Sequence, residues 1–379
     1  MSTKTLAPPS GAPTGRHLGV EMLRIVSTFM VIMLHTLGSY PILSIYTDNG
    51  VLLWLFEILS YGAVNIFAIT SGYVSCKSKF KLSRLLNLWF QVFFIFIIMT
   101  VALGQYSPTD LDEHAYRDMF FPILGDLNWY FTAFFALSLF SPFLNIMIAN
   151  LNQKQHKYLL TLIFVLFSVI TCIPEVGDLF QTTSGYSFLW LACMYVIGAY
   201  IRNYGVPTPS KRYIWLMGYF ACGLAAWAYM IIMADITTEL KGEAMFHRIF
   251  VSYTSPLILL EAICIFEFFV NLNFNFGRKF ICWVSSLTFG IFVFHTQDLY
   301  WIFGLEKRVA LIAQEGPLVS ALGVIGIAAT AFVLCGLATA VLMLGFKYLG
   351  INKLCDFLQN KVFGKINYML YSEDNSRKK

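Results

Sequence analysis

Three ionisable side chains lie within or beside the first long apolar stretch of the chain, residues 20–40. Glu21 and Arg24 are near its start and His35 is near its end. An ionisable group at membrane depth is costly, so each of the three is a candidate for function and needs a partner. Histidine is the side chain that ordinarily changes its charge near neutral pH, so His35 is a candidate for taking up or releasing a proton. The alternative is that His35 makes a hydrogen bond at a helix–helix contact and does no chemistry.

The composition predicts the element type that positions these residues. Hydrophobic residues make up 58% of the chain and charged residues 12%, against about 45–50% and about 25% in soluble domains. The 36 Phe and 20 Tyr residues are typical of lipid-facing and interfacial positions. We therefore expect an all-α fold, a polytopic bundle of membrane helices, and exclude an ordinary soluble protein.

About ten apolar segments are long enough to be membrane helices. They are residues 20–40, 51–75, 83–104, 128–150, 157–173, 185–201, 213–234, 249–271, 280–302 and 317–346. If the N-terminus is cytoplasmic, the inner segments carry 20 Lys and Arg residues and the outer loops carry 5, with Arg24 inside the first span. This bias predicts ten spans with both termini inside.

The segments divide the chain into three parts. Residues 1–19 are predicted to be a disordered cytoplasmic lead, residues 20–350 the membrane domain, and residues 351–379 a basic cytoplasmic tail. The net charge of +5 is dispersed over short loops, which argues against a nucleic-acid partner. The eight cysteines show no CxxC or Cys/His spacing, so we expect neither disulfides nor a metal.

The topology places two distant histidines at similar depth. His35 lies about 24 Å and His295 about 22 Å from the inner edge of their helices, at 1.5 Å per residue. His295 therefore either assists His35 or has a packing role. Glu21 and Arg24 lie near the cytoplasmic face, three residues apart, and are expected to pair with each other.

A basic cluster follows Ser71-Gly72 at the cytoplasmic end of the second span. It consists of Lys77, Lys79, Lys81 and Arg84. Such a cluster either reflects the bias of cytoplasmic loops towards positive charge or binds a phosphorylated ligand through charge-assisted hydrogen bonds.

Three further residues are weaker candidates. Glu261, near the middle of the eighth span, needs a partner or a proton and is a candidate for lining a cavity. Trp129 and Tyr130 lie at the predicted outer interface. They either stack against a sugar or belong to an aromatic belt.

Five stretches, in this order, resemble signatures of the integral-membrane acyltransferase-3 family, which includes bacterial polysaccharide O-acetyltransferases. The first, RHLGVEMLRIVSTFMVIMLH, has Glu21 where the family more often has Asp. The second, VNIFAITSGYVSCKSKFKLSRLLNLW, has Lys81-x-x-Arg84 where the family has paired arginines. The others are NWYFTAFFALSLFSPFLN, GYSFLWLACMYVIGAYIRNYG and SSLTFGIFVFH. The resemblance covers nearly the whole membrane region.

The resemblance implies transfer of an acetyl group from cytosolic acetyl-CoA to a hydroxyl of a cell-surface or lipid-linked glycan. Transfer to a hydroxyl needs a base or a transient acyl carrier, and His35 is the candidate, in one signature with Glu21 and Arg24. The basic cluster would bind coenzyme A. The acceptor would contact residues towards the outer side, for which the candidates are His295, Trp129, Tyr130 and Glu261.

The same resemblance implies a place in the cell and a set of partners. We expect a multi-pass protein of the bacterial cytoplasmic membrane. Some family members carry a soluble domain after the membrane unit, for which the tail of this sequence leaves no room. Transfer would then occur within the membrane unit or through a separate glycan-assembly protein.

A transporter or flippase of a lipid-linked saccharide is the alternative from another functional class. Such a protein would bind its substrate near the bilayer midplane without acyl chemistry. Transporters commonly contain two repeated halves. His35 and Ser71-Gly72 have no counterpart in residues 185–350, which favours an enzyme.

Overall fold

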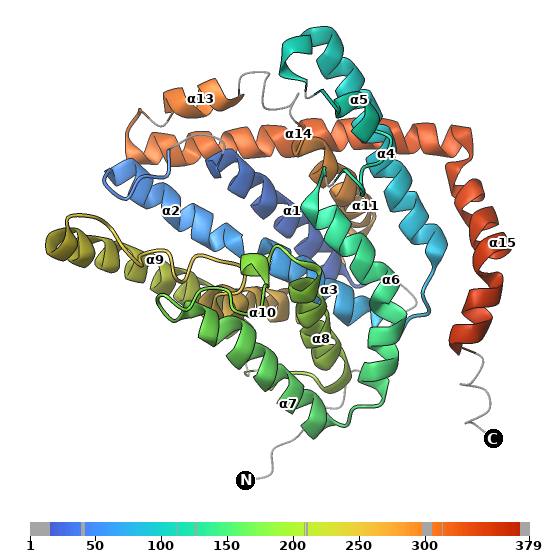
Figure 1. Ribbon diagram of the computed structural model, residues 1–379, viewed down its shortest axis with the longest axis horizontal. Helices are drawn as coiled ribbons and strands as arrows, with labels where there is room; N and C mark the ends of the chain where they lie inside the picture. Colours follow the sequence, from blue (N-terminus) through green and yellow to red (C-terminus); the bar gives the residue numbers. More distant parts are fainter. Residues whose placement is uncertain are drawn as a thin grey trace.

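The structure is a computed structural model that describes residues 16–38, 42–111, 113–125, 127–207, 209, 211–297, 305–312 and 314–371. Every regular element in these ranges is a helix, which confirms the predicted all-α class (Figure 1). The predicted lead falls mostly outside the described residues, but its last two residues belong to the first helix.

Figure 1 labels the helices in chain order. The α-helices are α1 (Leu18–Gly38), α2 (Asp48–Tyr61), α3 (Ala63–Ser75), α4 (Leu82–Tyr106), α5 (Ala115–Asp118), α6 (Trp129–Ala149), α7 (Gln153–Phe164), α8 (Phe188–Tyr204), α9 (Tyr213–Lys241), α10 (Pro256–Val270), α11 (Arg278–His295), α13 (Leu305–Ile312), α14 (Pro317–Leu349) and α15 (Ile351–Tyr371). Four short helical turns are η1 (Pro108–Asp110), η2 (Val165–Val169), η3 (Ile170–Cys172) and η4 (Thr183–Gly185).

Seven of the described helical segments are long and apolar enough to cross a membrane. They are Leu18–Gly38, Asp48–Ser75, Leu82–Tyr106, Trp129–Ala149, Gln153–Cys172, Tyr213–Lys241 and Pro317–Leu349. The other three predicted spans correspond to α8, α10 and α11, with 17, 15 and 18 residues. A helix of 15 residues is about 22 Å long, less than the ~30 Å of a bilayer core. The count of ten spans and the side of each terminus therefore stay predictions.

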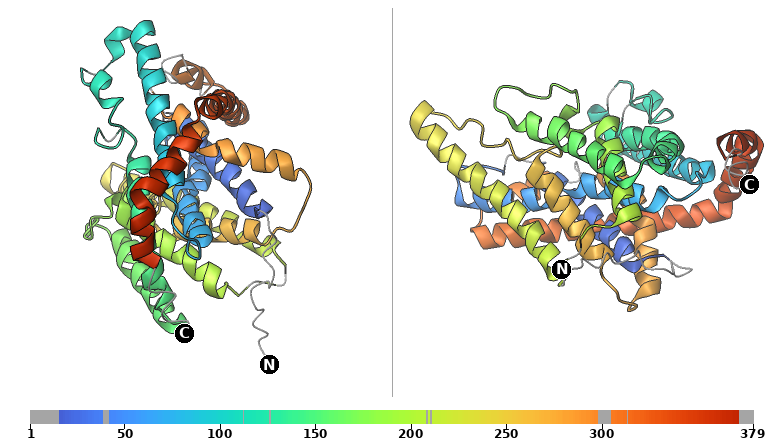
Figure 2. Two further views of the ribbon diagram at one scale, coloured as in Figure 1. Left: turned by 90° about the vertical axis from the view of Figure 1, so that its right-hand side faces the viewer. Right: turned by 90° about the horizontal axis from the view of Figure 1, so that it is seen from below.

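Three segments differ in detail from the sequence prediction. The predicted second span is two helices, α2 and α3, which meet at Gly62. The last predicted span is the unbroken 33-residue helix α14. The predicted tail contains α15, which turns away from the end of α14 and packs beside α4 (Figures 1 and 2). The contact between α15 and α4 includes a hydrogen bond from the Ser83 backbone N–H to Gln359, 3.0 Å long.

The centre of the bundle contains α3 and α8, which pack against each other through glycines. A Cβ atom on Gly72 would overlap the carbonyl oxygen of Tyr195, and one on Gly198 would overlap that of Ile69. Small residues allow membrane helices to approach this closely. The Ser-Gly-Tyr sequence of α3 therefore needs its glycine for packing.

Gly72→Ala is expected to lower the free energy of unfolding by about 1–3 kcal/mol, the usual cost of overfilling a packed contact. The melting temperature of the detergent-purified protein checks this. Gly345→Ala on α14 is the matched control, because nothing lies within 4 Å of the added Cβ. Equal melting temperatures for the two variants would contradict the close packing of α3 on α8.

Candidate active site

His35 and His295 meet side chain to side chain at the C-terminal ends of α1 and α11. Nδ1 of His35 lies 2.7 Å from Nε2 of His295, and the ring centroids are 4.9 Å apart. His295 is fully buried and His35 is partly buried. The equal depth expected from the sequence thus corresponds to a direct contact between helices 260 residues apart.

The hydrogen bonds of this pair define which nitrogens carry protons when both imidazoles are neutral. Nδ1 of His295 lies 3.1 Å from the carbonyl oxygen of Ile291. A carbonyl only accepts, so Nδ1 of His295 is the donor and its Nε2 is left as an acceptor. Nδ1 of His35 must then donate to that Nε2. Nε2 of His35 is consequently the basic nitrogen of the pair.

The N-terminus of α6 lies against the end of α11. The side chain of Asn128 caps α6 by accepting from the Phe131 N–H at 2.9 Å. Its amide nitrogen donates to the hydroxyl of Thr296 at 3.3 Å, one residue beyond His295. An Asn at this cap therefore both starts α6 and fixes it next to the histidine pair.

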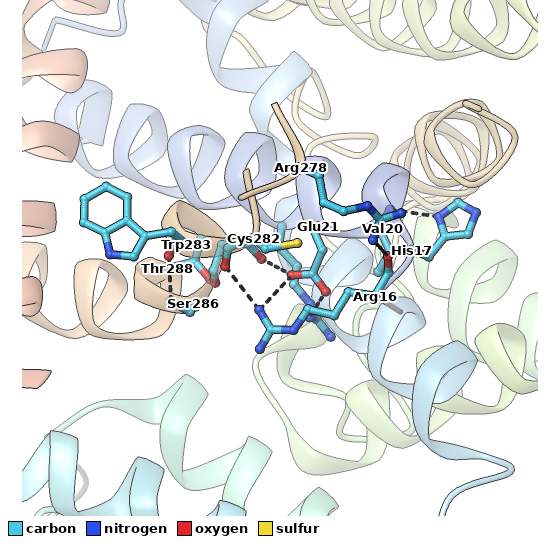
Figure 3. Close-up of polar contacts among 11 residues, drawn as sticks. Arg16, His17, Val20, Glu21, Arg278, Cys282, Trp283, Ser286 and Thr288 are labelled. Carbon is cyan, nitrogen blue, oxygen red and sulfur yellow. Dashed lines mark hydrogen bonds and ion pairs between the residues drawn. The ribbon is translucent and has the colours of Figure 1, made fainter. Parts of the chain in front are cut away.

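Glu21 joins the other ends of α1 and α11 (Figure 3). Its carboxylate accepts from Arg24 at 3.1 Å, which is the predicted pair, and from the Ser285 hydroxyl at 2.5 Å. Arg16 is 3.9 Å from the carboxylate and also donates to the Cys282 carbonyl at 3.1 Å. The sequence indicated Arg24 and missed the other two partners.

The structure does not bring Glu21 and Arg24 to His35. Fourteen residues of α1 separate Glu21 from His35, which is about 21 Å along the helix. The contacts of Glu21 with Ser285 and of His35 with His295 show that α1 and α11 run parallel. Because the contact at Glu21 holds α1 against α11, it can help to position His35 from a distance. A direct catalytic role for Glu21 and Arg24 stays a prediction.

His17 precedes α1 beside the same group. Its Nδ1 accepts from the Val20 N–H at 3.4 Å, at the first turn of the helix. Burial lowers the pKa of His17, and the charges of Arg202 and Arg278 lower it further. His17 is therefore expected to be a neutral capping residue at neutral pH.

A cavity of about 200 Å³ lies between α3, α4, α6 and α8. The residues that line it are Ser71, Ser75, Ser78, Lys79, Phe80, Lys81, Arg84, Leu85, Leu88, Phe134, Leu137, Ser138, Ser141, Asn145 and Tyr195. Three of the four predicted basic residues are among them, and Lys77 is not. The cavity thus combines cationic, hydroxyl and apolar surfaces.

Aromatic rings connect the wall of this cavity to the histidine pair. The ring of Phe134 in the cavity wall stacks on Tyr130 with centroids 6.0 Å apart. Tyr130 contacts Phe292 at 5.3 Å, and Phe292 contacts His295 at 5.7 Å. The apolar end of the cavity is therefore three ring contacts from His295.

The comparison with known families agrees with this arrangement. The acyltransferase domain of the acyltransferase-3 family matches residues 17–340, which include both histidines and the whole lining of the cavity. The chain belongs to the acyltransferase-3 family. No curated protein and no solved structure matches the chain. The protein is thus a membrane acyltransferase by family and by its apolar helices.

The remaining predicted residues of the acyltransferase, Tyr130, Trp129 and Glu261, lie in different surroundings. Tyr130 is 8% exposed, so its ring faces protein and not lipid, and its position at the outer interface stays a prediction. Its neighbour Trp129 is partly exposed and contacts other rings. Glu261 on α10 is fully buried, and neither carboxylate oxygen has a hydrogen-bond partner among the described residues. Glu261 does not line the cavity, and its role in acceptor binding stays a prediction.

Two polar residues of the acyltransferase cavity had no role in the sequence prediction. The Tyr195 hydroxyl donates to Oδ1 of Asn145 at 2.8 Å, and the Asn145 amide donates to the Ser75 carbonyl at 3.1 Å. Both residues lie in stretches that resemble family signatures, but helical periodicity alone did not indicate that they face each other. Together they connect α6, α8 and the end of α3 beside the basic residues.

Proposed function

We propose that this acyltransferase moves an acetyl group from cytosolic acetyl-CoA to a hydroxyl of a cell-surface or lipid-linked glycan. The observation that carries the proposal is the His35–His295 contact, which leaves Nε2 of His35 as the proton acceptor. A row of aromatic contacts connects this pair to the cavity lined by Lys and Arg residues. We place the protein in the bacterial cytoplasmic membrane with both termini inside, as the charge bias predicts.

The basic cavity is suited to the donor. Coenzyme A carries phosphate groups, and the side chains of Lys79, Lys81 and Arg84 supply matching cations at the cavity. The cavity also has an apolar wall that includes Leu88 and Phe134. We propose that the phosphates bind the cations and that the acyl-carrying arm follows the apolar wall towards the histidines.

His35 is the group that makes the acceptor reactive. Nε2 of His35 takes the proton from the acceptor hydroxyl while the oxygen attacks the thioester carbonyl. The carbon–sulfur bond then breaks, and the coenzyme A thiolate takes the proton from His35. In the covalent variant of this scheme, Nε2 first attacks the carbonyl, the carbon–sulfur bond breaks and the coenzyme A thiolate leaves. The acceptor hydroxyl then attacks the acetyl-imidazole, the nitrogen–carbon bond breaks, and the hydroxyl proton passes to the thiolate. A rapid-quench search for acetylated His35 distinguishes the two.

Removing a cation from the cavity is expected to weaken donor binding. Arg84→Ala should raise the KM for acetyl-CoA by about tenfold, since a charge-assisted contact contributes about 1.5–3 kcal/mol. The shift should shrink at high salt, because salt screens exposed charges. Lys77→Ala is the matched control, because Lys77 belongs to the same basic cluster but does not line the cavity. The same KM shift in both variants would show a general charge effect and contradict the donor site.

The transporter alternative is tested with the same material. Purified protein in detergent is incubated with radiolabelled acetyl-CoA and with glycan stripped of its acetyl groups. Transfer of label to the glycan supports the proposal. A protein that binds the glycan but leaves the thioester intact would be a transporter.

A further inference from the structure

Four aromatic rings from four different segments gather at the start of α6, where Trp129 is three ring contacts from His295. They are Tyr61 at the end of α2, Trp129 at the start of α6, Tyr186 before α8 and Tyr253 before α10. The ring centroids are 4.6 Å apart for Trp129–Tyr186, 4.8 Å for Tyr186–Tyr253 and 4.9 Å for Tyr61–Tyr253. Trp129 also stacks on Tyr253 at 6.2 Å. We call this group the aromatic cluster.

The aromatic cluster adjoins the site and has accessible faces. Trp129 follows Asn128, whose amide donates to Thr296 next to His295. Its ring also contacts Tyr130 at 5.7 Å. Tyr186 is 42% exposed and Trp129 is partly exposed, whereas Tyr253 is buried beneath them. A molecule lying on Trp129 and Tyr186 would therefore lie close to the histidine pair.

A buried carboxylate lies beside the aromatic cluster. Glu57 on α2 is 9% exposed, and its Oε2 has no hydrogen-bond partner among the described residues. Glu57 lies four residues before Tyr61 and three residues after Trp54 on α2, so these three side chains share one face of the helix. The guanidinium of Arg248 is exposed and lies 4.9 Å from the ring centroid of Trp54. A buried polar atom without a partner is costly and indicates a missing donor.

Hydrogen bonds and close packing fix the conformation of the segment before α8, which carries Tyr186. Asp178 accepts from the backbone N–H and the hydroxyl of Thr182, at 2.9 and 2.8 Å. Gly185 has a φ of +99°, and a Cβ atom there would overlap Tyr253. Glycine is therefore needed where this segment meets the aromatic cluster.

We propose that the aromatic cluster, together with Glu57 and Arg248, binds a sugar ring of the acceptor and presents its hydroxyl to His35. This inference rests on the proposed function and names the acceptor site. A pyranose has an apolar C–H face and a rim of hydroxyls. The exposed faces of Trp129 and Tyr186 can pack against the C–H face. The carboxyl group of Glu57 and the guanidinium of Arg248 can hydrogen-bond the hydroxyls, as in sites that combine aromatic side chains with a few polar groups.

The test measures acceptor and donor binding separately. The acceptor probe is surface glycan from cells that lack this protein, de-O-acetylated, in one arm as released polymer and in the other as lipid-linked extract. Tyr186→Ala should raise the KM for the acceptor by about tenfold, which corresponds to about 1.4 kcal/mol, because it removes one of the two exposed rings. Its affinity for acetyl-CoA should stay that of the wild type. The arm in which the shift appears identifies the source of the sugar.

Three variants make the result specific. Tyr186→Phe keeps the ring and should have the acceptor KM of the wild type. If the effect of Tyr186→Ala came only from the loss of the hydroxyl, Tyr186→Phe would show the same raised KM. Glu57→Gln should raise the acceptor KM as Tyr186→Ala does, because it replaces a carboxyl oxygen with an amide group and keeps the shape. Tyr46→Ala is the matched control: Tyr46 is a 71% exposed tyrosine of the segment before α2.

Failure of this inference and failure of the proposed function give different results. An active wild type with an unchanged acceptor KM in Tyr186→Ala and Glu57→Gln would overturn the acceptor site alone. A wild type that transfers no acetyl would overturn the proposed function. In that case saturation-transfer NMR still tests the site: the sugar protons should receive saturation from the wild type and lose it with Tyr186→Ala, and equal saturation from both would overturn it.

Discussion

His35→Ala is expected to reduce acetyl transfer by about 10²- to 10⁴-fold, the range that a positioned general base contributes. Alanine removes the Nε2 lone pair that takes the hydroxyl proton or the acetyl group. The measurement is the rate of label transfer from acetyl-CoA to de-O-acetylated glycan by purified protein. The loss should fall on kcat, because Lys79, Lys81 and Arg84, the cations proposed to bind the donor, line the cavity and do not contact His35.

The amount of membrane-inserted protein and the affinity for acetyl-CoA separate this effect from misfolding. Both should equal the wild-type values in His35→Ala. His114→Ala is the matched control, since His114 is an exposed histidine whose Nε2 lies 3.2 Å from a carboxylate oxygen of its neighbour Glu113. A His35→Ala protein that is folded, binds acetyl-CoA and transfers acetyl at the wild-type rate would eliminate the role of His35.

His295→Ala is expected to reduce kcat by about 10²- to 10⁴-fold, although His295 does not touch the acetyl group in this account. Without the acceptor Nε2 of His295, the Nδ1–H of His35 has lost the partner at 2.7 Å that fixes the tautomer and the ring orientation. His295 is thus a positioning residue. The KM for acetyl-CoA should change little.

His295→Gln distinguishes positioning from packing. The amide oxygen of Gln accepts a hydrogen bond, so Gln can hold the Nδ1–H of His35 and should recover part of the rate. His295→Leu fills similar space without an acceptor and should be as inactive as His295→Ala. Equal rates for the Gln and Leu variants would show that His295 only packs.

The sequence predicted the features that depend on one helix at a time. Regular 1.5 Å rises placed His35 and His295 at one depth, and the three-residue spacing paired Glu21 with Arg24. The sequence also showed a cluster of four basic residues directly after Ser71-Gly72. The structure places three of them around one cavity.

Features that depend on the packing of several helices were missed. Hydropathy does not distinguish a residue that faces lipid from one that faces protein, so the sequence did not indicate that the ring of Tyr130 is buried between Phe134 and Phe292. The same limit applies to α8 and α10, because hydropathy alone does not show whether their apolar residues face lipid or the bundle, where many of them are buried. Ser285, the partner of Glu21 on α11, is 264 residues away in sequence, and no local pattern indicates it.

The central claim is that an imidazole deep in the bundle transfers an acetyl group from a donor bound at the basic cavity. The most direct measurement incubates purified wild-type and His35→Ala protein with radiolabelled acetyl-CoA and de-O-acetylated glycan and counts alkali-labile label on the glycan. We predict labelled glycan with the wild type and none above background with His35→Ala. Equal labelling by the two proteins, or an intact thioester with the wild type, would contradict the account.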